Sequence, residues 1–274
     1  MAKQRAPKSK EIAVVTDNNV IPFDQNIPDY LKDTSADKIG NLGQGDFKIP
    51  RILMLQALSP EVKTFQGEAI PGDFWHNGAS KSLGNEFVFV PVLVNKRVIL
   101  WRPRHEGGGM LAFSRNAVDW DMGANKTFEV TLRSKDKNVV KWATGKNVPT
   151  SGLLDWGSSN PDEENSAPAA TLVYEYLCYL PAHPELSPCL FGVTKTALPA
   201  GKQLNTSLFM LRKPTASVAV RAWTIEDNRD QGDFFNIQFK TAGYVSKEVY
   251  EITSKLAEQH KDYTPEYVQE ETEA

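Results

Sequence analysis

The sequence predicts a mainly β fold with one C-terminal helix, and three observations support this prediction. Hydrophobic residues make up 41% and charged residues 24% of the 274 residues, which is the balance of a globular chain that buries a core. Short runs rich in β-branched and aromatic residues recur between Gly, Pro and Asn. Apolar residues at helical spacing occur clearly in one segment, just before an acidic end.

The two ends of the chain differ in composition from the part between them. Residues 1–46 are polar, contain several prolines and end in a glycine-rich patch, so we expect an extended, partly disordered leader. Residues 262–274 carry five acidic and no basic side chains, and we expect a disordered acidic tail. Between them we expect a mainly β body, 47–245, and a helix, 246–261.

The strongest strand signal comes from two β-rich runs, 87–94 and 97–102, which are separated by Asn95 and Lys96. This pattern predicts a β-hairpin. Pro91 has no amide to donate, so it predicts a sheet edge or a bulge at that point. The further predicted strands are 127–133, 139–143, 171–180, 189–195, 216–225 and 234–240.

The predicted helix begins at Ser246, a residue type that caps helix N-termini. Val249, Ile252, Thr253 and Leu256 follow at a spacing that places them on one helical face. In contrast, turn-forming and acidic residues fill 157–168, which we expect to be a long surface loop.

Several classes of protein are disfavoured by what the sequence contains. The longest apolar run, Phe87 to Val94, is far shorter than the roughly 18 residues of a membrane-spanning helix. The basic N-terminus is not followed by the apolar segment of a secretory signal, so we expect a cytoplasmic protein without a membrane association. The cysteines, Cys178 and Cys189, and the scattered histidines do not have metal-ligand spacing, so we expect no metal.

Catalytic signatures are also missing, so we expect a protein that is not an enzyme and needs no cofactor. Acidic pairs leave one alternative open. Asp119 and Asp121, or Asp155 with the acids at 162–164, are residue types that hold Mg²⁺ in nucleases. The second group lies in the predicted loop, where acids usually only interact with solvent.

Basic charge is concentrated in one part of the chain, because residues 81–147 contain twelve Lys or Arg against six Asp or Glu. Residues 155–190 contain six acids and no Lys or Arg. A basic stretch in a mildly acidic protein creates a local field that attracts a polyanion, or else it is a solvated sheet face. The run Gly107-Gly108-Gly109 in this stretch either binds phosphate through its amides or connects two strands.

Aromatic residues interleave with these cations. Strand alternation places Arg97, Ile99 and Trp101 on one face of the chain and Lys96 and Arg102 on the other. A tryptophan beside cations suits single-stranded nucleic acid, because a base stacks on the ring while the cations neutralise phosphates; the alternative is that Trp101 is a core residue. The predicted contacts are Lys96, Arg97, Trp101, Arg102, Arg104 and Trp75, with a second basic strip that includes Lys195, Lys202 and Arg221.

The acidic charge of the C-terminal tail suggests that the tail has a regulatory role. A disordered acidic segment competes with nucleic acid for a basic groove and binds partner proteins when it is displaced, or it serves only solubility. The predicted partner-binding residues are Asp262, Glu266, Glu270, Glu271 and Glu273.

Three segments carry a resemblance to a known family: the run from Lys48 to Val62, the run Pro71-Gly-Asp-Phe-Trp75, and Ile99-Leu-Trp-Arg-Pro-Arg104 with the glycine run after it. They resemble bacteriophage and prophage proteins that are associated with single-stranded-DNA binding. The resemblance implies an OB-type β-barrel, elaborated here because the chain is longer than one small barrel. It also implies an acidic C-terminal tail. Such tails often end in an aromatic residue, whereas this chain ends in Glu273-Ala274, which leaves the mode of partner docking open.

These features together predict a sequence-tolerant single-stranded-DNA-binding protein of phage replication or recombination. Its partners are expected to be single-stranded DNA and, through the tail, phage replication or recombination proteins, in the cytoplasm of the host cell. The alternative is a β-rich phage virion or assembly protein, and a Mg²⁺-dependent nuclease is the third reading. The sequence leaves the oligomeric state open.

Overall fold

A computed structural model describes residues 48–121, 126–132, 138–145, 147–163, 165–229 and 232–261, and all structural statements below concern these residues. The chain divides into two units, Met1–Phe47 and Lys48–Ala274. The expected leader and acidic tail lie outside the described residues.

The strands of the second unit are β1 (Arg51–Met54), β2 (Phe74–His76), β3 (Lys81–Gly84), β4 (Glu86–Trp101), β5 (Met110–Ser114), β6 (Thr127–Thr131), β7 (Val139–Ala143), β8 (Ala170–Tyr179), β9 (Cys189–Thr194), β10 (Val218–Arg229) and β11 (Gly232–Tyr244). The α-helices are α1 (Pro60–Thr64), α2 (Leu198–Leu211) and α3 (Lys247–His260), and short 3₁₀ turns are η3 (Arg104–Glu106), η4 (Pro184–Leu186), η5 (Lys195–Ala197) and η6 (Thr215–Ser217).

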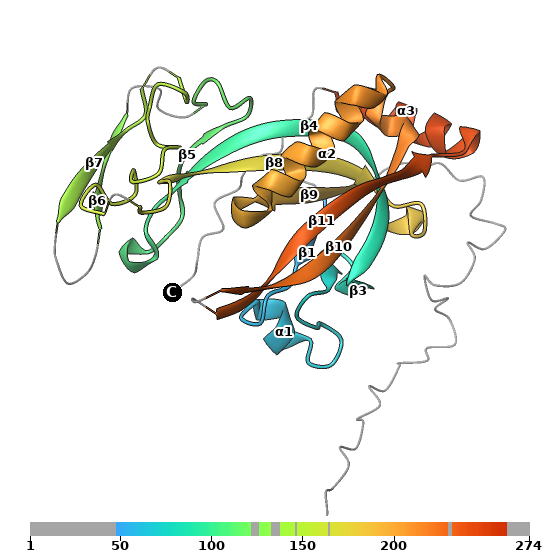
Figure 1. Cartoon of the computed structure of the whole chain (residues 1–274), viewed down its shortest axis with the longest axis horizontal. Helices are drawn as coiled ribbons and strands as arrows, with labels where there is room; N and C mark the ends of the chain where they lie inside the picture. Colours follow the sequence, from blue (N-terminus) through green and yellow to red (C-terminus); the bar gives the residue numbers. More distant parts are fainter. Residues whose placement is uncertain are drawn as a thin grey trace, which may run out of the picture. The chain divides into compact units, whose positions relative to one another are not determined.

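The main sheet has nine strands in the order β11-β10-β4-β8-β9-β1-β2-β3, with β5 paired to β4 as well. Its strand pairs are antiparallel except for β1 and β9, which run parallel. The sheet curls into a half-barrel, and α2 lies across it (Figure 1). The mainly β class and the C-terminal helix are therefore confirmed.

Strand β4 corrects the predicted hairpin. Residues 86–101 form one continuous strand, and Asn95 and Lys96 lie in its middle, opposite Glu175 and Tyr174 of β8. The long partner strand β8 supplies cross-strand pairing on both sides of the expected turn, and the sequence contains no glycine there to reverse the chain. The bulge expected at Pro91 is present, since the register with β8 shifts between Pro91 and Leu93.

The two faces of the sheet are both covered, which explains why the middle strands are almost wholly apolar. On the inner face of the half-barrel, the largest core cluster includes Phe89, Tyr176 and Phe191 and extends to α2. A second cluster on the same face of β4 includes Val98 and Leu100 and joins them to the small β6–β7 sheet. On the outer face, α3 covers a third cluster.

Helix α3 agrees with the prediction, and α2 was not predicted. The Ser246 hydroxyl accepts a hydrogen bond from the Val249 amide, so it caps α3 as expected. In α2, Pro199 stands in the first turn, and Leu204 and Leu208 are buried against the sheet. The six predicted strands outside β4 correspond to β6, β7, β8, β9, β10 and β11.

Residues 147–169, where they are described, contain no strand or helix. The predicted loop at 157–168 is thus confirmed for its described residues, and backbone bonds such as Gly157 N–H to the Ser166 carbonyl (2.8 Å) hold it together. No described helix is long and apolar enough to cross a membrane.

Candidate nucleic-acid interface

Two of the predicted contacts lie in the interior. Trp75 is 1% exposed and packs on Phe65, with ring centroids 5.0 Å apart. Arg97 is 2% exposed, and its guanidinium lies 3.1 Å from the Glu175 carboxylate, which is equally buried. In this structure both side chains are buried, so neither is accessible to a nucleic acid, in contrast to what the sequence suggested.

Lys96, one residue before Arg97, points to the inner face and is exposed. Its strand neighbour across the sheet is Tyr174 of β8, and Tyr174 in turn pairs with Val193 of β9. Tyr174 is half-buried, and this burial raises the pKa of its hydroxyl. A cation and an aromatic ring therefore lie side by side between the two core clusters of this face.

Helix α2 is fixed beside Lys96 and Tyr174 by two close contacts. A Cβ on Gly201 would lie 3.0 Å from Val193 and 3.1 Å from Tyr174, so the absence of a side chain lets the helix approach the sheet. One turn later, the Tyr176 hydroxyl donates a hydrogen bond of 2.8 Å to the Asn205 side chain. Burial raises the pKa of Tyr176, so the hydroxyl keeps the proton that it donates.

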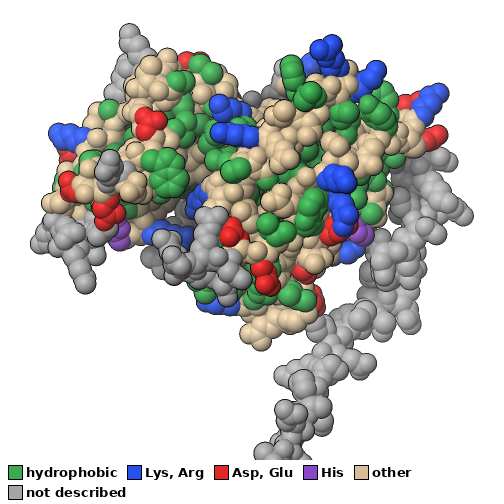
Figure 2. Space-filling model, viewed as in Figure 1, with side chains coloured by type: hydrophobic (Ala, Val, Ile, Leu, Met, Phe, Trp, Pro, Cys, Tyr) green, Lys and Arg blue, Asp and Glu red, His purple; other side chains and the backbone are tan. Residues whose placement is uncertain are grey.

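Two further predicted contacts, Lys195 and Lys202, are close in the chain to the residues of these contacts and are exposed. Lys195 follows β9 two residues after Val193, and Lys202 follows Gly201. Because neighbouring strands are about 4.8 Å apart, the row from Lys96 to Val193 spans only about 10 Å. We call Lys96, Tyr174, Lys195 and Lys202 the saddle. Figure 2 shows the molecule hollowed between the lobe of β6 and β7 and the lobe that carries α2, with Lys and Arg side chains in the hollow.

Among the described residues, no carboxylate compensates the positive charge of the saddle. Residues 186–225 contain five Lys or Arg and no Asp or Glu. Within the described part of the chain, the three saddle lysines have no carboxylate within ion-pair distance. Exposed lysines without partners are available to an anionic ligand.

The other residues predicted on β4 form a separate corner at its end. Trp101 is 43% exposed and lies on the outer face, opposite to that of Lys96. Arg102 lies 3.8 Å from Glu106, and Arg104 is exposed. A backbone hydrogen bond from the Thr131 amide lowers the pKa of Glu106, so this carboxylate is held to β6.

The glycine run after this corner is a tight turn. Gly107, Gly108 and Gly109 all have positive φ angles, of 93°, 67° and 91°, which side chains disfavour. The amides of Gly107 and Gly108 donate to the carbonyls of Arg104 and Pro103. The structure thus favours the connecting role of these glycines over phosphate binding.

Arg221 lies apart from both the saddle and the Trp101 corner. It is on the outer face of β10, where its guanidinium pairs with Glu86 and lies 5.5 Å from the centre of the Trp223 ring. The hydrogen bond to Glu86 raises the pKa of Arg221. The exposed predicted contacts are therefore divided among three places. Among the described residues, the saddle lysines and Arg104 of the corner have no carboxylate within ion-pair distance, whereas Arg102 and Arg221 do.

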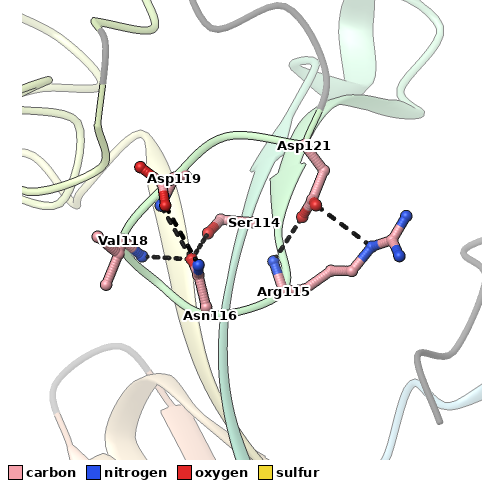
Figure 3. Close-up of polar contacts among 6 residues, drawn as sticks. All are labelled: Ser114, Arg115, Asn116, Val118, Asp119 and Asp121. Carbon is pink, nitrogen blue, oxygen red and sulfur yellow. Dashed lines mark hydrogen bonds and ion pairs between the residues drawn. The ribbon is translucent and has the colours of Figure 1, made fainter. Parts of the chain in front are cut away.

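The acids considered for Mg²⁺ stabilise a turn. Asp121 accepts the Arg115 backbone amide at 2.7 Å and lies 3.3 Å from the Arg115 side chain. Asn116 accepts the amides of Val118 and Asp119 and donates to the Asp119 carboxylate. Figure 3 shows the two carboxylates bound to different partners, Asp119 to Asn116 and Asp121 to Arg115, so the geometry does not favour a nuclease that uses this pair.

Among the described residues, no group of three or more His, Cys, Asp or Glu is placed to hold a metal ion. Cys178 and Cys189 are buried opposite each other on β8 and β9. Burial raises the pKa of Cys189 to about 12, so this thiol stays protonated.

Sequence reasoning missed α2, although a signal for it was present. Leu204, Leu208 and Leu211 recur at helical spacing after Pro199, a residue that favours the first turn of a helix. Tyr174 could not be selected from sequence, since its neighbours in space come from β4, β9 and α2. The predicted partner-binding acids of the tail, Asp262, Glu266, Glu270, Glu271 and Glu273, lie outside the described residues.

The fold is that of a β-rich protein, and several of its basic side chains are exposed. Residues 17–265 match the family model described as Pam3 phage gp34-like protein, and the chain belongs to this family. The expected relation to bacteriophage proteins is thereby confirmed. No curated protein and no solved structure matches the chain.

Proposed function

We propose that this phage protein binds single-stranded DNA without sequence preference and performs no catalysis itself. The observation that carries the proposal is the saddle, where a half-buried tyrosine lies beside exposed lysines that have no carboxylate partner among the described residues. Lysines neutralise phosphates, and an aromatic ring stacks with any base, so this combination suits a single strand of any sequence. The Trp101 corner, with Arg102 and Arg104, provides a second contact of the same kind.

The proposal includes a cellular setting. A phage protein of this kind acts in the cytoplasm of the infected cell, in DNA replication or recombination, and the acidic tail binds phage proteins of the same process. The five acids of the tail are opposite in charge to the saddle. The same opposition makes the tail a competitor of DNA.

The experiment is a fluorescence-anisotropy titration of a labelled, mixed-sequence single strand at several salt concentrations. The Lys96→Gln/Lys202→Gln variant removes two cations of the saddle. We expect weaker binding and a smaller salt dependence. The slope of log K against log salt should fall by about 1.4, because each lost phosphate contact accounts for about 0.7 in single strands.

A matched control is Lys63→Gln/Lys81→Gln, which removes two exposed lysines on α1 and β3 and so changes net charge equally. It should bind like the parent chain. Equal weakening of both variants would show a response to net charge and contradict the saddle. If the parent chain fails to bind at low salt, the proposed function is wrong, and the virion or assembly component becomes the better reading.

A further inference from the structure

Large apolar side chains are exposed at the C-terminus of α2, at one end of the second unit. Phe209 and Met210 are 83% and 73% exposed, which is unusual for adjacent large apolar side chains. Arg212 and Lys213 follow them, and residues 209–214 contain no acid. Tyr244, at the end of β11, is 62% exposed and pairs with Val218, the residue after η6. We call Phe209, Met210, Arg212, Lys213 and Tyr244 the basic end.

A second exposed apolar group lies in the loops around α1. Leu58 and Ile70 are 84% and 54% exposed. Residues 56–73 contain three acids, Glu61, Glu68 and Asp73, against one Lys, which gives a net charge of −2. We call Leu58, Ile70, Glu61 and Glu68 the acidic end.

Strand β11 separates the two ends. The Gln56 side chain donates to the Phe235 carbonyl and accepts the Phe235 amide, both at 3.0 Å, and thereby binds the acidic end to the start of β11. A Cβ on Gly72 would lie 2.7 Å from the Phe235 ring, so this loop also approaches closely. The basic end lies at the other end of the strand, nine residues further at Tyr244. A strand rises about 3.3 Å per residue, so the two ends are about 30 Å apart.

We propose that copies of this chain associate head to tail, with the basic end of one copy on the acidic end of the next. Both surfaces pair exposed apolar side chains with charge, and their charges are opposite. A contact between two different surfaces of the same chain repeats into a ring or a filament, whereas a contact of one surface with itself stops at a dimer. Each surface has few residues, so the association is weak and depends on protein concentration. The inference does not depend on DNA binding.

The test is sedimentation velocity of the full chain without DNA, over a range of concentrations. The parent chain should sediment faster as its concentration rises. Phe209→Ser/Lys213→Glu, which removes the basic end, and Leu58→Ser/Glu68→Lys, which removes the acidic end, should each remain monomeric. Since each variant keeps one intact end, their equimolar mixture should form a dimer and nothing larger.

The control is Val139→Ser/Lys141→Glu, which makes an equivalent change on β7 at an apolar residue that is 60% exposed. It should associate like the parent chain. The substituted residues are exposed, and unchanged circular dichroism would confirm that the variants fold.

Three results would overturn the proposal. The first is a parent chain that stays monomeric at every concentration. The second is self-association of either variant by itself, which would indicate a symmetric contact of the end that this variant keeps. The third is loss of association when the chain is ended at Lys261, which would identify the acidic tail as the occupant of the basic end.

Discussion

Two neighbouring residues show how far position within the sheet decides the role of a cation. Lys96 and Arg97 are adjacent on β4 and have the same charge, and alternation correctly predicted that they lie on opposite faces. Lys96 lies between two core clusters and is exposed. Arg97 is buried with Glu175, and Arg51 approaches the same carboxylate to 3.4 Å. An ion pair at this depth is costly to break, because the remaining charge would be left uncompensated. Arg97 therefore supports the sheet and does not contact a ligand.

A prediction at the residue scale concerns His76, which is buried on β2. Its Nδ1 accepts the Ala79 amide at 3.0 Å, and its Nε2 then donates to the Leu186 carbonyl at 3.2 Å, a tautomer assigned from these partners. Burial lowers the pKa of His76 below its ordinary value of 6.5. The folded chain thus disfavours the proton that the unfolded chain takes up, so stability should be complete above about pH 6.5 and fall as the pH decreases further.

Thermal unfolding measured between about pH 7 and pH 5 tests this prediction. The parent chain should lose stability over this range, and His76→Gln should show a smaller loss. An identical pH dependence in the two proteins would assign the effect to other groups.

At the scale of elements, the sequence predicted those whose pattern is local. Helix α3 was found because its cap, Ser246, and its apolar face lie within one segment. The prediction of a hairpin at Asn95 and Lys96 was wrong. Strand β4 continues through these residues because β8 pairs with both halves of the strand. Non-local pairing therefore overrode the local signal.

A prediction at this scale concerns the packing of α3 on η6. The Thr253 side chain is fully buried, and its hydroxyl donates to the Ala216 carbonyl at 2.7 Å. Thr253→Val keeps the shape and removes the donor, so it should lower the free energy of unfolding by about 1–3 kcal/mol, because a buried carbonyl loses its partner. Thr206→Val is the matched control: the Thr206 hydroxyl also bonds to a carbonyl of its helix, but it is exposed, and the change should stay within about 0.5 kcal/mol. Chemical denaturation measures both, and equal effects would contradict the role of Thr253.

At the scale of the whole molecule, net charge decides how a basic surface behaves in an acidic protein. The chain has a net charge of −3, and removal of residues 262–274 with their five acids changes it to −3 + 5 = +2. If the tail competes with DNA, the chain ended at Lys261 should bind single-stranded DNA more tightly at low salt, and the difference should shrink as salt screens the charges.

Anisotropy titrations of both chains measure this effect. A full-length chain with the five tail acids replaced by their amides is the control, because it keeps the length of the tail and removes its charge. It should bind like the truncated chain. Unchanged affinity in both would show that the tail does not compete.

The sequence by itself determined the mainly β class, the predicted strands outside β4, the capped C-terminal helix, the bulge at Pro91 and the relation to bacteriophage proteins. All of these depend on residues that are close in the chain or on a matched sequence motif. Only the tertiary structure decided that β4 is continuous, that Trp75 and Arg97 are buried, and that Lys96 and the Gly201 turn of α2 both lie beside Tyr174. The physical reason is that exposure depends on which distant segments cover a face, and local spacing does not specify those segments.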